Sequence, residues 1–241
     1  MDAVQTDRPG PLVSPLPELS EAQRARAQRQ VLLPGFGEES QRRLASARVL
    51  VVGAGGLGSA SVPYLAGAGV GTIGIVDDDR VELSNLHRQV AHSTGDIGRK
   101  KVDSLADTVH ALDPGIRVEL HSFRLTAGNA LDLFRGYDVI VDGSDNFPTR
   151  YLVADAAEIL GLPLVWGSIL QYHGQVGVSW RPKYPGYRDL FPAPPAPRTS
   201  STAAPGSAAR TLRHDRFAAR DRNAEAHHRD RRSAARAGAD L

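Results

Sequence analysis

Short apolar runs alternate with longer amphipathic stretches between residues 20 and 180, and this alternation predicts an α/β protein. Residues 48–52 and 71–76 are largely apolar and end at glycine or aspartate, as is typical of strands buried on both faces. Because strands alternate with helices, we expect a Rossmann-like, doubly wound and mostly parallel sheet. Further strands are expected at 117–123, 138–141, 163–166 and 175–180, the last an antiparallel extension, and helices at 20–31, 38–44, 100–112, 129–134, 150–160 and after Gly58.

Composition divides the chain into three zones. Residues 1–19 are rich in proline and are expected to form a flexible leader, and residues 20–191 form the folded domain. Residues 192–241 are first rich in proline and then in arginine and alanine, and too poor in large apolar residues to offset the entropy of ordering. We therefore expect a disordered tail and a fold that is incomplete at its C-terminus.

The tail has two interpretations. A frameshift or a mispredicted gene end in a GC-rich coding sequence is the simplest account of its composition. A basic tail that binds nucleic acid or phospholipid is the alternative, but it lacks the interleaved aromatic residues that single-strand binders use for stacking.

Charge and cysteine content exclude several classes of function. The formal net charge is only +2, so nothing in the whole chain indicates a nucleic acid or an acidic membrane as partner. The absence of cysteine excludes disulfides, thiolate zinc sites and a cysteine nucleophile. The chain shows neither a signal peptide nor an apolar run of the ~18 residues that a membrane helix needs. We expect a soluble, cytoplasmic protein.

A glycine-rich segment follows the first apolar strand. Its glycines are Gly53, Gly55, Gly56 and Gly58. Gly53 permits a tight turn, Gly55 and Gly56 let backbone N–H groups approach a phosphate, and Gly58 lets helix and strand pack closely. Asp77, about 20 residues downstream, can accept hydrogen bonds from ribose hydroxyls. The pattern predicts a nucleotide without saying which one, and a ligand-free glycine turn is the alternative.

Two positive side chains are expected close to this turn. Arg88 ends the segment that begins with Ser84 and Asn85, and Lys101 opens the helix that follows. A guanidinium fork and an ammonium group would both suit a triphosphate. Considered singly, each is an ordinary solvated surface charge.

Acidic residues follow the strand at 138–141, where ligands bind in open α/β sheets. Asp145 could hold Mg²⁺ against phosphate oxygens, because Mg²⁺ favours one or two carboxylates together with phosphate. The alternative is that Asp145 is the N-cap of the helix that contains Arg150.

Together these motifs resemble the ATP site of the ThiF/MoeB/HesA family, which is related to ubiquitin-activating enzymes. The resemblance covers residues 20–191, and the lack of paired cysteines looks most like the adenylyltransferase/sulfurtransferase branch, in which a rhodanese domain usually follows. It implies that Gly56, Arg88 and Lys101 contact the phosphates, that Asp77 contacts the ribose and Asn85 the nucleotide, and that Asp145 holds magnesium with Asn146 beside it. Arg29 resembles an arginine that reaches across a dimer to the partner's ATP. The paired cysteines of zinc-binding members are absent, so we expect no structural zinc.

The resemblance implies an ATP-dependent and magnesium-dependent enzyme. It would adenylate the C-terminal glycine carboxylate of a ubiquitin-like sulfur-carrier protein, for molybdopterin, thiamine or cysteine biosynthesis. A homodimer is expected, together with a sulfur donor such as a rhodanese or a cysteine desulfurase. Two alternatives remain at this point: an NAD-dependent oxidoreductase, which rests on the glycine motif and Asp77, and an inactive nucleotide-binding remnant.

Overall fold

The computed structural model describes residues 10–195, and the predicted tail lies almost entirely outside them. The chain divides into two compact units, residues 1–168 with 175–192, and residues 169–174 with 193–241. The second unit contributes the turn at Gln171, which has a positive φ of 52°. None of the helices within 10–195 is both long and apolar enough to cross a membrane.

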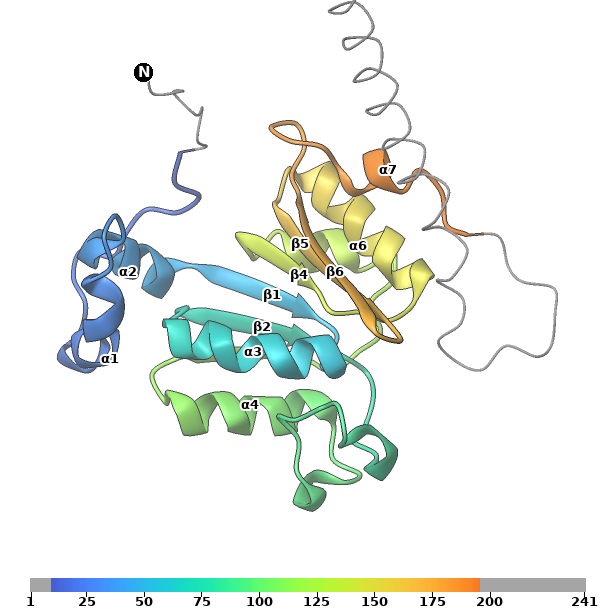
Figure 1. Cartoon of the computed structure of the whole chain (residues 1–241), viewed down its shortest axis with the longest axis horizontal. Coiled ribbons are helices and arrows are strands. Elements are labelled where there is room, and N and C mark those ends of the chain that lie inside the picture. Colours follow the sequence, from blue (N-terminus) through green and yellow to red (C-terminus); the bar gives the residue numbers. More distant parts are fainter. Residues whose placement is uncertain (1–9, 196–241) are drawn as a thin grey trace, which may run out of the picture. The chain divides into compact units, whose positions relative to one another are not determined.

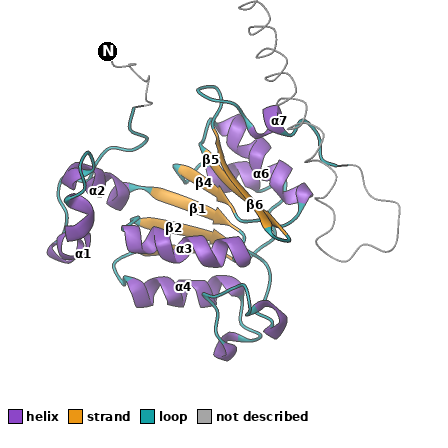
Figure 2. Ribbon diagram, viewed as in Figure 1, coloured by secondary structure: helices purple, strands orange, loops and turns teal. Residues whose placement is uncertain are grey.

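A sheet of six strands organises the first unit (Figures 1 and 2). The strands are β1 (Arg48–Val52), β2 (Thr72–Val76), β3 (Arg117–His121), β4 (Val139–Asp142), β5 (Leu164–Leu170) and β6 (His173–Ser179), in the order β3-β2-β1-β4-β5-β6. The first five are mutually parallel. Because only two residues separate β5 from its neighbour β6, this last pair is antiparallel. The predicted fold class, including the antiparallel extension, is confirmed.

The helices also follow the predicted pattern. They are α1 (Glu21–Val31), α2 (Gly37–Ser46), α3 (Gly56–Ala68), α4 (Lys101–Leu112), α5 (Ala130–Phe134), α6 (Phe147–Leu160) and α7 (Tyr187–Leu190), with 3-10 turns at Leu83–Asn85 and Thr94–Asp96. Ser20 and Gln23 form a capping box at the start of α1. Among the helices the largest difference is at α6, which begins at Phe147 rather than 150 because Pro148 is tolerated in a first helical turn. Helix α2 ends at Ser46, two residues later than expected.

The core has two layers, one on each face of the sheet. Val49 and Val51 of β1 pack with α3 and α4, whereas Leu50 and Val52 pack with α5 and α6. This alternation follows from the two-residue period of a strand. Helices therefore cover both faces, as expected of a doubly wound fold, and the loops that carry the candidate residues emerge at the carboxyl edge of the sheet.

Part of the predicted leader is attached to the domain. The N–H of Leu16 donates to the carbonyl of Arg42, and the Arg42 guanidinium donates to the carbonyls of Leu16 and Pro17. Leu19 is buried. Residues 16–19 thus pack against α2, while the domain boundaries themselves stay a prediction.

Candidate nucleotide-binding site

The site lies where the strand order reverses. β1 has β2 on one side and β4 on the other, so the loops after β1 and β4 leave the sheet next to each other. The N–H of Gly143 donates to the carbonyl of Val52 at 2.8 Å, which joins the two loops directly. In open α/β sheets such a switch point is where ligands bind.

The glycine-rich turn has the geometry that its sequence predicts. Gly53 has a φ of 94°, a conformation that favours glycine. A Cβ on Gly58 would lie 2.9 Å from the carbonyl carbon of Gly53 and closer still to its oxygen. Gly55 is the N-cap of α3 and offers no side-chain cap, so the first helical turn presents its N–H groups to an anion.

Asp77 holds the turn in place. Its Oδ2 accepts a hydrogen bond from the N–H of Ala54 at 2.7 Å, and its Oδ1 accepts one from the N–H of Asp79 at 2.8 Å. The expected role of Asp77 was contact with the ribose. In the structure the carboxylate also fixes the backbone on which the phosphates would lie.

Arg88 lies beside the turn. Its Cγ and Cδ are 3.8 and 3.9 Å from the point where a Cβ on Gly56 would be. The guanidinium is exposed, and its contacts with residues of the described range 10–195 are two long ones of 3.4 Å, to the Ser84 carbonyl and the His87 ring. Its cationic end is therefore available to a ligand at the turn.

The predicted polar residues of the same segment, Ser84 and Asn85, bond mainly to their neighbours Glu82 and Gln89. Ser84 Oγ and Asn85 Nδ2 both donate to Glu82, at 3.1 and 3.2 Å. Asn85 Oδ1 accepts from the side chain of buried Gln89 at 2.8 Å. Gln89 in turn lies 3.7 Å from the Cβ position of Gly55.

Lys101 reaches the turn through Asp79. Its side chain is only 7% exposed, and Nζ donates to Asp79 Oδ2 at 2.8 Å. Because Asp79 is also bonded to Asp77, the contacts run from Lys101 through both carboxylates to Ala54 of the turn. The carboxylates of residues 77–79 lie within 4.8 Å of one another, and Lys101 pairs with one of them, Asp79.

The loop after β4 is fixed by a buried ion pair. Asp142 Oδ1 accepts from the N–H of Ser144 at 2.9 Å, and the Arg150 guanidinium donates to the carbonyls of Ser144 and Gly167, both at 2.7 Å. Arg150 Nε lies 3.5 Å from Asp142 Oδ2. Burial raises the pKa of Asp142, against the opposing effects of Ser144 and Arg150. Hydrogen bonds to both its N–H and its carbonyl therefore fix the backbone of Ser144, one residue before Asp145.

Asp145 itself is exposed and makes no hydrogen bond or ion pair with any residue of the described range. The interpretation of Asp145 as the N-cap of α6 is wrong, because Asn146 is the cap and its side chain accepts from the N–H of Thr149 at 3.0 Å. Ser144 N lies 3.4 Å from the Cβ position of Gly53, so Asp145 follows directly after the contact with the turn.

Arg29 lies at the opposite end of the domain. It is exposed on α1, whose Arg26 donates to the carbonyl of Leu112 at the C-terminal end of α4. Lys101 is at the other end of this 12-residue helix, about 18 Å away at 1.5 Å per residue. One chain therefore does not bring Arg29 together with the other candidates, and its role across a dimer stays a prediction.

Sequence reasoning missed the residues that hold the site together. These are Asp79, Gln89, His92, Ser104, Asp142 and Arg150. Asp79 was visible in the acidic run after β2. Asp142 was likewise visible among the acids that follow the strand at 138–141. His92 and Arg150 were not singled out, because they act through contacts with Ala54 and Gly167, which lie 38 and 17 residues away along the chain.

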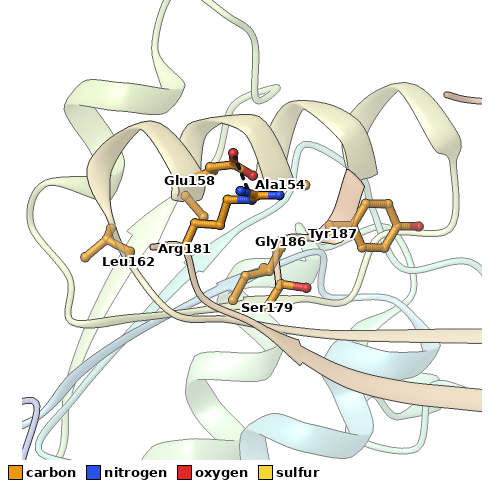
Figure 3. A pocket seen from close by; sticks show the side chains of 9 residues that line it. Ala154, Glu158, Leu162, Ser179, Arg181, Gly186 and Tyr187 are labelled. Atoms are coloured by element: carbon orange, nitrogen blue, oxygen red, sulfur yellow. Dashed lines mark ion pairs between the residues drawn. The ribbon is translucent and has the colours of Figure 1, made fainter. Parts of the chain in front are cut away.

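The cavity drawn in Figure 3 is separate from this site. It lies between α6 and the residues after β6, where Arg181 pairs with Glu158 at 3.5 Å. Its volume is about 10 Å³, room for about one water molecule. It is too small to hold a nucleotide.

These features define the class of the protein: it is a Rossmann-like domain with an anion-binding glycine turn at the switch point of its sheet. The sequence model of the ThiF family matches residues 27–213, and the chain belongs to this family. It is 52% identical over 200 residues to "Probable adenylyltransferase/sulfurtransferase MoeZ" of Mycobacterium tuberculosis, which covers 81% of this chain and 51% of that protein. The chain thus spans about half the length of that relative.

Two further similarities concern a second curated relative and a solved structure. The chain is 54% identical over 177 residues to the sulfur carrier protein adenylyltransferase of Thermus thermophilus, covering 71% of this chain and 65% of that one. The structure of E. coli tRNA N6-threonylcarbamoyladenosine dehydratase, TcdA, in complex with ATP aligns with a TM-score of 0.58 and 28% identity. That alignment covers 61% of this chain and 60% of TcdA.

Proposed function

We propose that this chain uses ATP to adenylate the C-terminal glycine carboxylate of a ubiquitin-like sulfur-carrier protein. The observation that carries the proposal is the meeting of Arg88, Lys101 and the loop of Asp145 at the uncapped glycine turn. The ATP complex of TcdA supports the choice of nucleotide. The name of the Thermus thermophilus relative supports the choice of protein substrate.

In this proposal the triphosphate lies against the N-terminus of α3. Backbone N–H groups at Gly55 and Gly56 face it, with the exposed Arg88 guanidinium beside them. Lys101 adds charge from its buried position and can exchange Asp79 for a phosphate oxygen. Asp77 would contact the ribose, as the motif predicts, and Ser84 and Asn85 would contribute to the binding of the nucleotide.

Asp145 is the residue that fits a magnesium ion. Its carboxylate is exposed, is bonded to no residue within 10–195, and follows the peptide that touches the turn. Mg²⁺ bound by one carboxylate and phosphate oxygens would offset negative charge on the triphosphate. Asn146 is committed to capping α6, so it supports the loop rather than offering a free ligand.

The reaction needs positioning more than covalent chemistry. A carboxylate oxygen of the carrier attacks the α-phosphorus of ATP, an O–P bond forms, and the bond to the bridging oxygen breaks so that pyrophosphate leaves. The carrier carboxyl is already ionised at neutral pH, so no general base is required. What this chain supplies is an in-line geometry and cations that offset the charge of the phosphates.

Arg29 is assigned to the site of a second subunit. Its position on α1, about the length of α4 from Lys101, fits a role in trans better than one in cis. The acyl-adenylate would then accept sulfur from a donor such as a rhodanese or a cysteine desulfurase. The relatives named adenylyltransferase/sulfurtransferase support a link with sulfur transfer, although this chain spans only about half of them.

The NAD-dependent alternative has no feature of its own in its favour. The glycine turn and Asp77 suit either nucleotide. A dinucleotide would give no reason for a buried lysine at this edge, or for an exposed carboxylate that bonds to no residue within 10–195. The three similar proteins described above are two adenylyltransferases and a dehydratase by name.

Exchange of labelled pyrophosphate into ATP tests the function directly. The chain is incubated with Mg-ATP and a carrier that ends in Gly-Gly, and we expect exchange that depends on both. Asp145→Ala should lower the exchange rate by about 100-fold, because a lost charge contact in a transition state costs on the order of 3 kcal/mol. Asp132→Ala, which removes an exposed carboxylate of α5, is the matched control and should leave the rate unchanged.

A competition between ligands separates the nucleotides. ATP should raise the melting temperature of the chain and NAD should not. Stabilisation by NAD alone would reject the proposal. Binding of ATP without pyrophosphate exchange would instead identify an inactive nucleotide-binding remnant.

A further inference from the structure

His92 is a buried polar residue for which the proposed reaction has no use. It ends the segment that carries Arg88, is only 6% exposed, and lies between two elements of the site. Its Nε2 is 3.1 Å from the carbonyl oxygen of Ala54 in the glycine turn, and its Nδ1 is 2.8 Å from Ser104 Oγ on α4. Burying an imidazole is costly unless both nitrogens are bonded, and here both are.

The Ala54 carbonyl decides which nitrogen of His92 carries a proton. A carbonyl oxygen can only accept, so Nε2 carries the hydrogen and donates it to Ala54. In the neutral ring Nδ1 then accepts from the Ser104 hydroxyl. Ser104 is itself buried, so this contact fixes the orientation of the ring.

Ala54 is thereby held from both sides. Its N–H donates to Asp77 and its carbonyl accepts from His92. The residues on either side are Gly53 and Gly55, which have no side chain to restrict the backbone. The two hydrogen bonds to Ala54 therefore fix the direction in which the following N–H groups point.

The same imidazole connects the turn to the helix of Lys101. Ser104 lies three residues after Lys101, so the two share one face of α4. A single side chain thus sets the distance between the anion-binding N–H groups and the lysine.

We propose that His92 is a positioning residue, whose Nε2–H fixes the glycine turn in the conformation that receives the nucleotide phosphates. This inference rests on the proposed function for the identity of the nucleotide. His92 does not touch the substrate in this scheme and acts through its bonds to Ala54 of the turn and Ser104 of α4.

Two substitutions of similar size separate positioning from mere packing. Glutamine places its amide nitrogen near the position of Nε2, whereas asparagine places its amide near Nδ1. His92→Gln should keep the bond to Ala54, and its affinity for Mg-ATP should stay within about threefold of that of the parent chain. His92→Asn loses that bond, and we expect its affinity to fall by roughly tenfold, as measured by calorimetric titration. Equal affinities of the two variants, or the weaker binding in His92→Gln, would overturn the proposal.

Amide hydrogen exchange supplies a readout that needs no nucleotide and no carrier. The Ala54 amide should exchange about tenfold faster in His92→Asn than in the parent chain, and at nearly the parent rate in His92→Gln. If His92→Asn does not fold, Ser104→Ala takes its place, because it frees the ring without removing it and should also accelerate this exchange. If the Ala54 amide of the folded variant exchanges at the parent rate, the positioning role is refuted. If it exchanges faster, as expected, but the parent chain does not adenylate the carrier, only the proposed function is refuted.

Discussion

Gly58 shows how closely the helix and strand of the nucleotide site approach each other. A methyl group at this position would overlap the carbonyl of Gly53, which is backbone and cannot rotate away. The close approach lets the first turn of α3 start directly above β1, with its N–H groups open. The absence of a side chain at Gly58 therefore helps to form the anion site, although the N–H groups that would face the anion are those of Gly55 and Gly56.

The substitution Gly58→Ala tests this close packing. We expect it to lower the free energy of unfolding by about 1–3 kcal/mol, as overpacking does in tightly packed sites. Gly67→Ala on the same helix is the control, since a Cβ there meets nothing within 4 Å. Removing a helical glycine should raise stability by up to about 1 kcal/mol. Urea unfolding measures both variants, and a similar effect in the two would contradict the argument.

The single residues of the site were predictable to different degrees. Glycines 53, 55, 56 and 58 were visible because a turn between strand and helix is specified by neighbours along the chain. The bonds from His92 to Ala54 and from Lys101 to Asp79 span 38 and 22 residues. No local pattern encodes such pairs, so the sequence led us to expect Lys101 near the turn but did not show its partner Asp79.

At the scale of elements, strand β3 is attached to the sheet by a polar cluster. Glu119 accepts from both sides: Arg48 donates to its two oxygens at 3.0 and 2.9 Å, and the Tyr137 hydroxyl donates at 2.8 Å. His121 Nε2 lies 2.7 Å from the same hydroxyl. Because the Tyr137 hydroxyl donates its hydrogen to Glu119, His121 Nε2 carries a hydrogen and donates it to the hydroxyl oxygen. A neutral imidazole is sufficient for this bond.

The cluster predicts how stability depends on pH. Burial lowers the pKa of His121 below its ordinary 6.5, and nearby Glu119 opposes this only in part. The pKa of Glu119 is lowered despite burial, by Tyr137 and Arg48, so this carboxylate stays ionised around neutral pH. A histidine with a lowered pKa binds fewer protons when folded than when unfolded. Its stabilising contribution is complete above pH 6.5 and is lost as the pH falls through the folded-state value.

Chemical denaturation at about pH 8 and about pH 5 measures this contribution. The parent chain should lose more free energy of unfolding between the two conditions than His121→Gln, which keeps a donor near the position of Nε2. His110→Gln, at an exposed position on α4, is the control and should behave like the parent. An unchanged pH dependence in His121→Gln would show that His121 does not titrate in this way.

The elements were easier to predict than their ends. Strand β1 agrees with its expected bounds, because a buried apolar run needs no information from elsewhere in the chain. Helix α6 starts three residues earlier than expected, because Asn146 caps it and Pro148 is tolerated in its first turn. The residues 145 and 146 are both common helix caps, so the sequence alone does not show which of them has the side chain that bonds to Thr149.

At the scale of the whole molecule, the candidate residues gather at one edge of the sheet with one exception. The glycine turn, Arg88, Lys101 and Asp145 lie at the carboxyl edge, whereas α1 and Arg29 lie at the far end of α4 (Figure 1). No rearrangement of one side chain covers a distance of about 18 Å. If Arg29 contributes to catalysis, it does so in a second copy of the chain, and a closed dimer then contains two shared sites.

Mixed dimers decide whether Arg29 acts in trans. Arg29→Ala and Asp145→Ala chains carrying different tags are produced together, and the mixed species is purified by both tags. If Arg29 acts in trans, one site of each mixed dimer is intact and the other carries both defects, so the pyrophosphate exchange rate should recover to about half of the parent rate. If Arg29 acts in cis, each site keeps one defect and nothing recovers. Each variant alone, purified with the same tags, supplies the baseline. A mixed dimer whose rate does not recover would rule out a role of Arg29 in trans. An active parent chain that forms no dimer would rule it out as well.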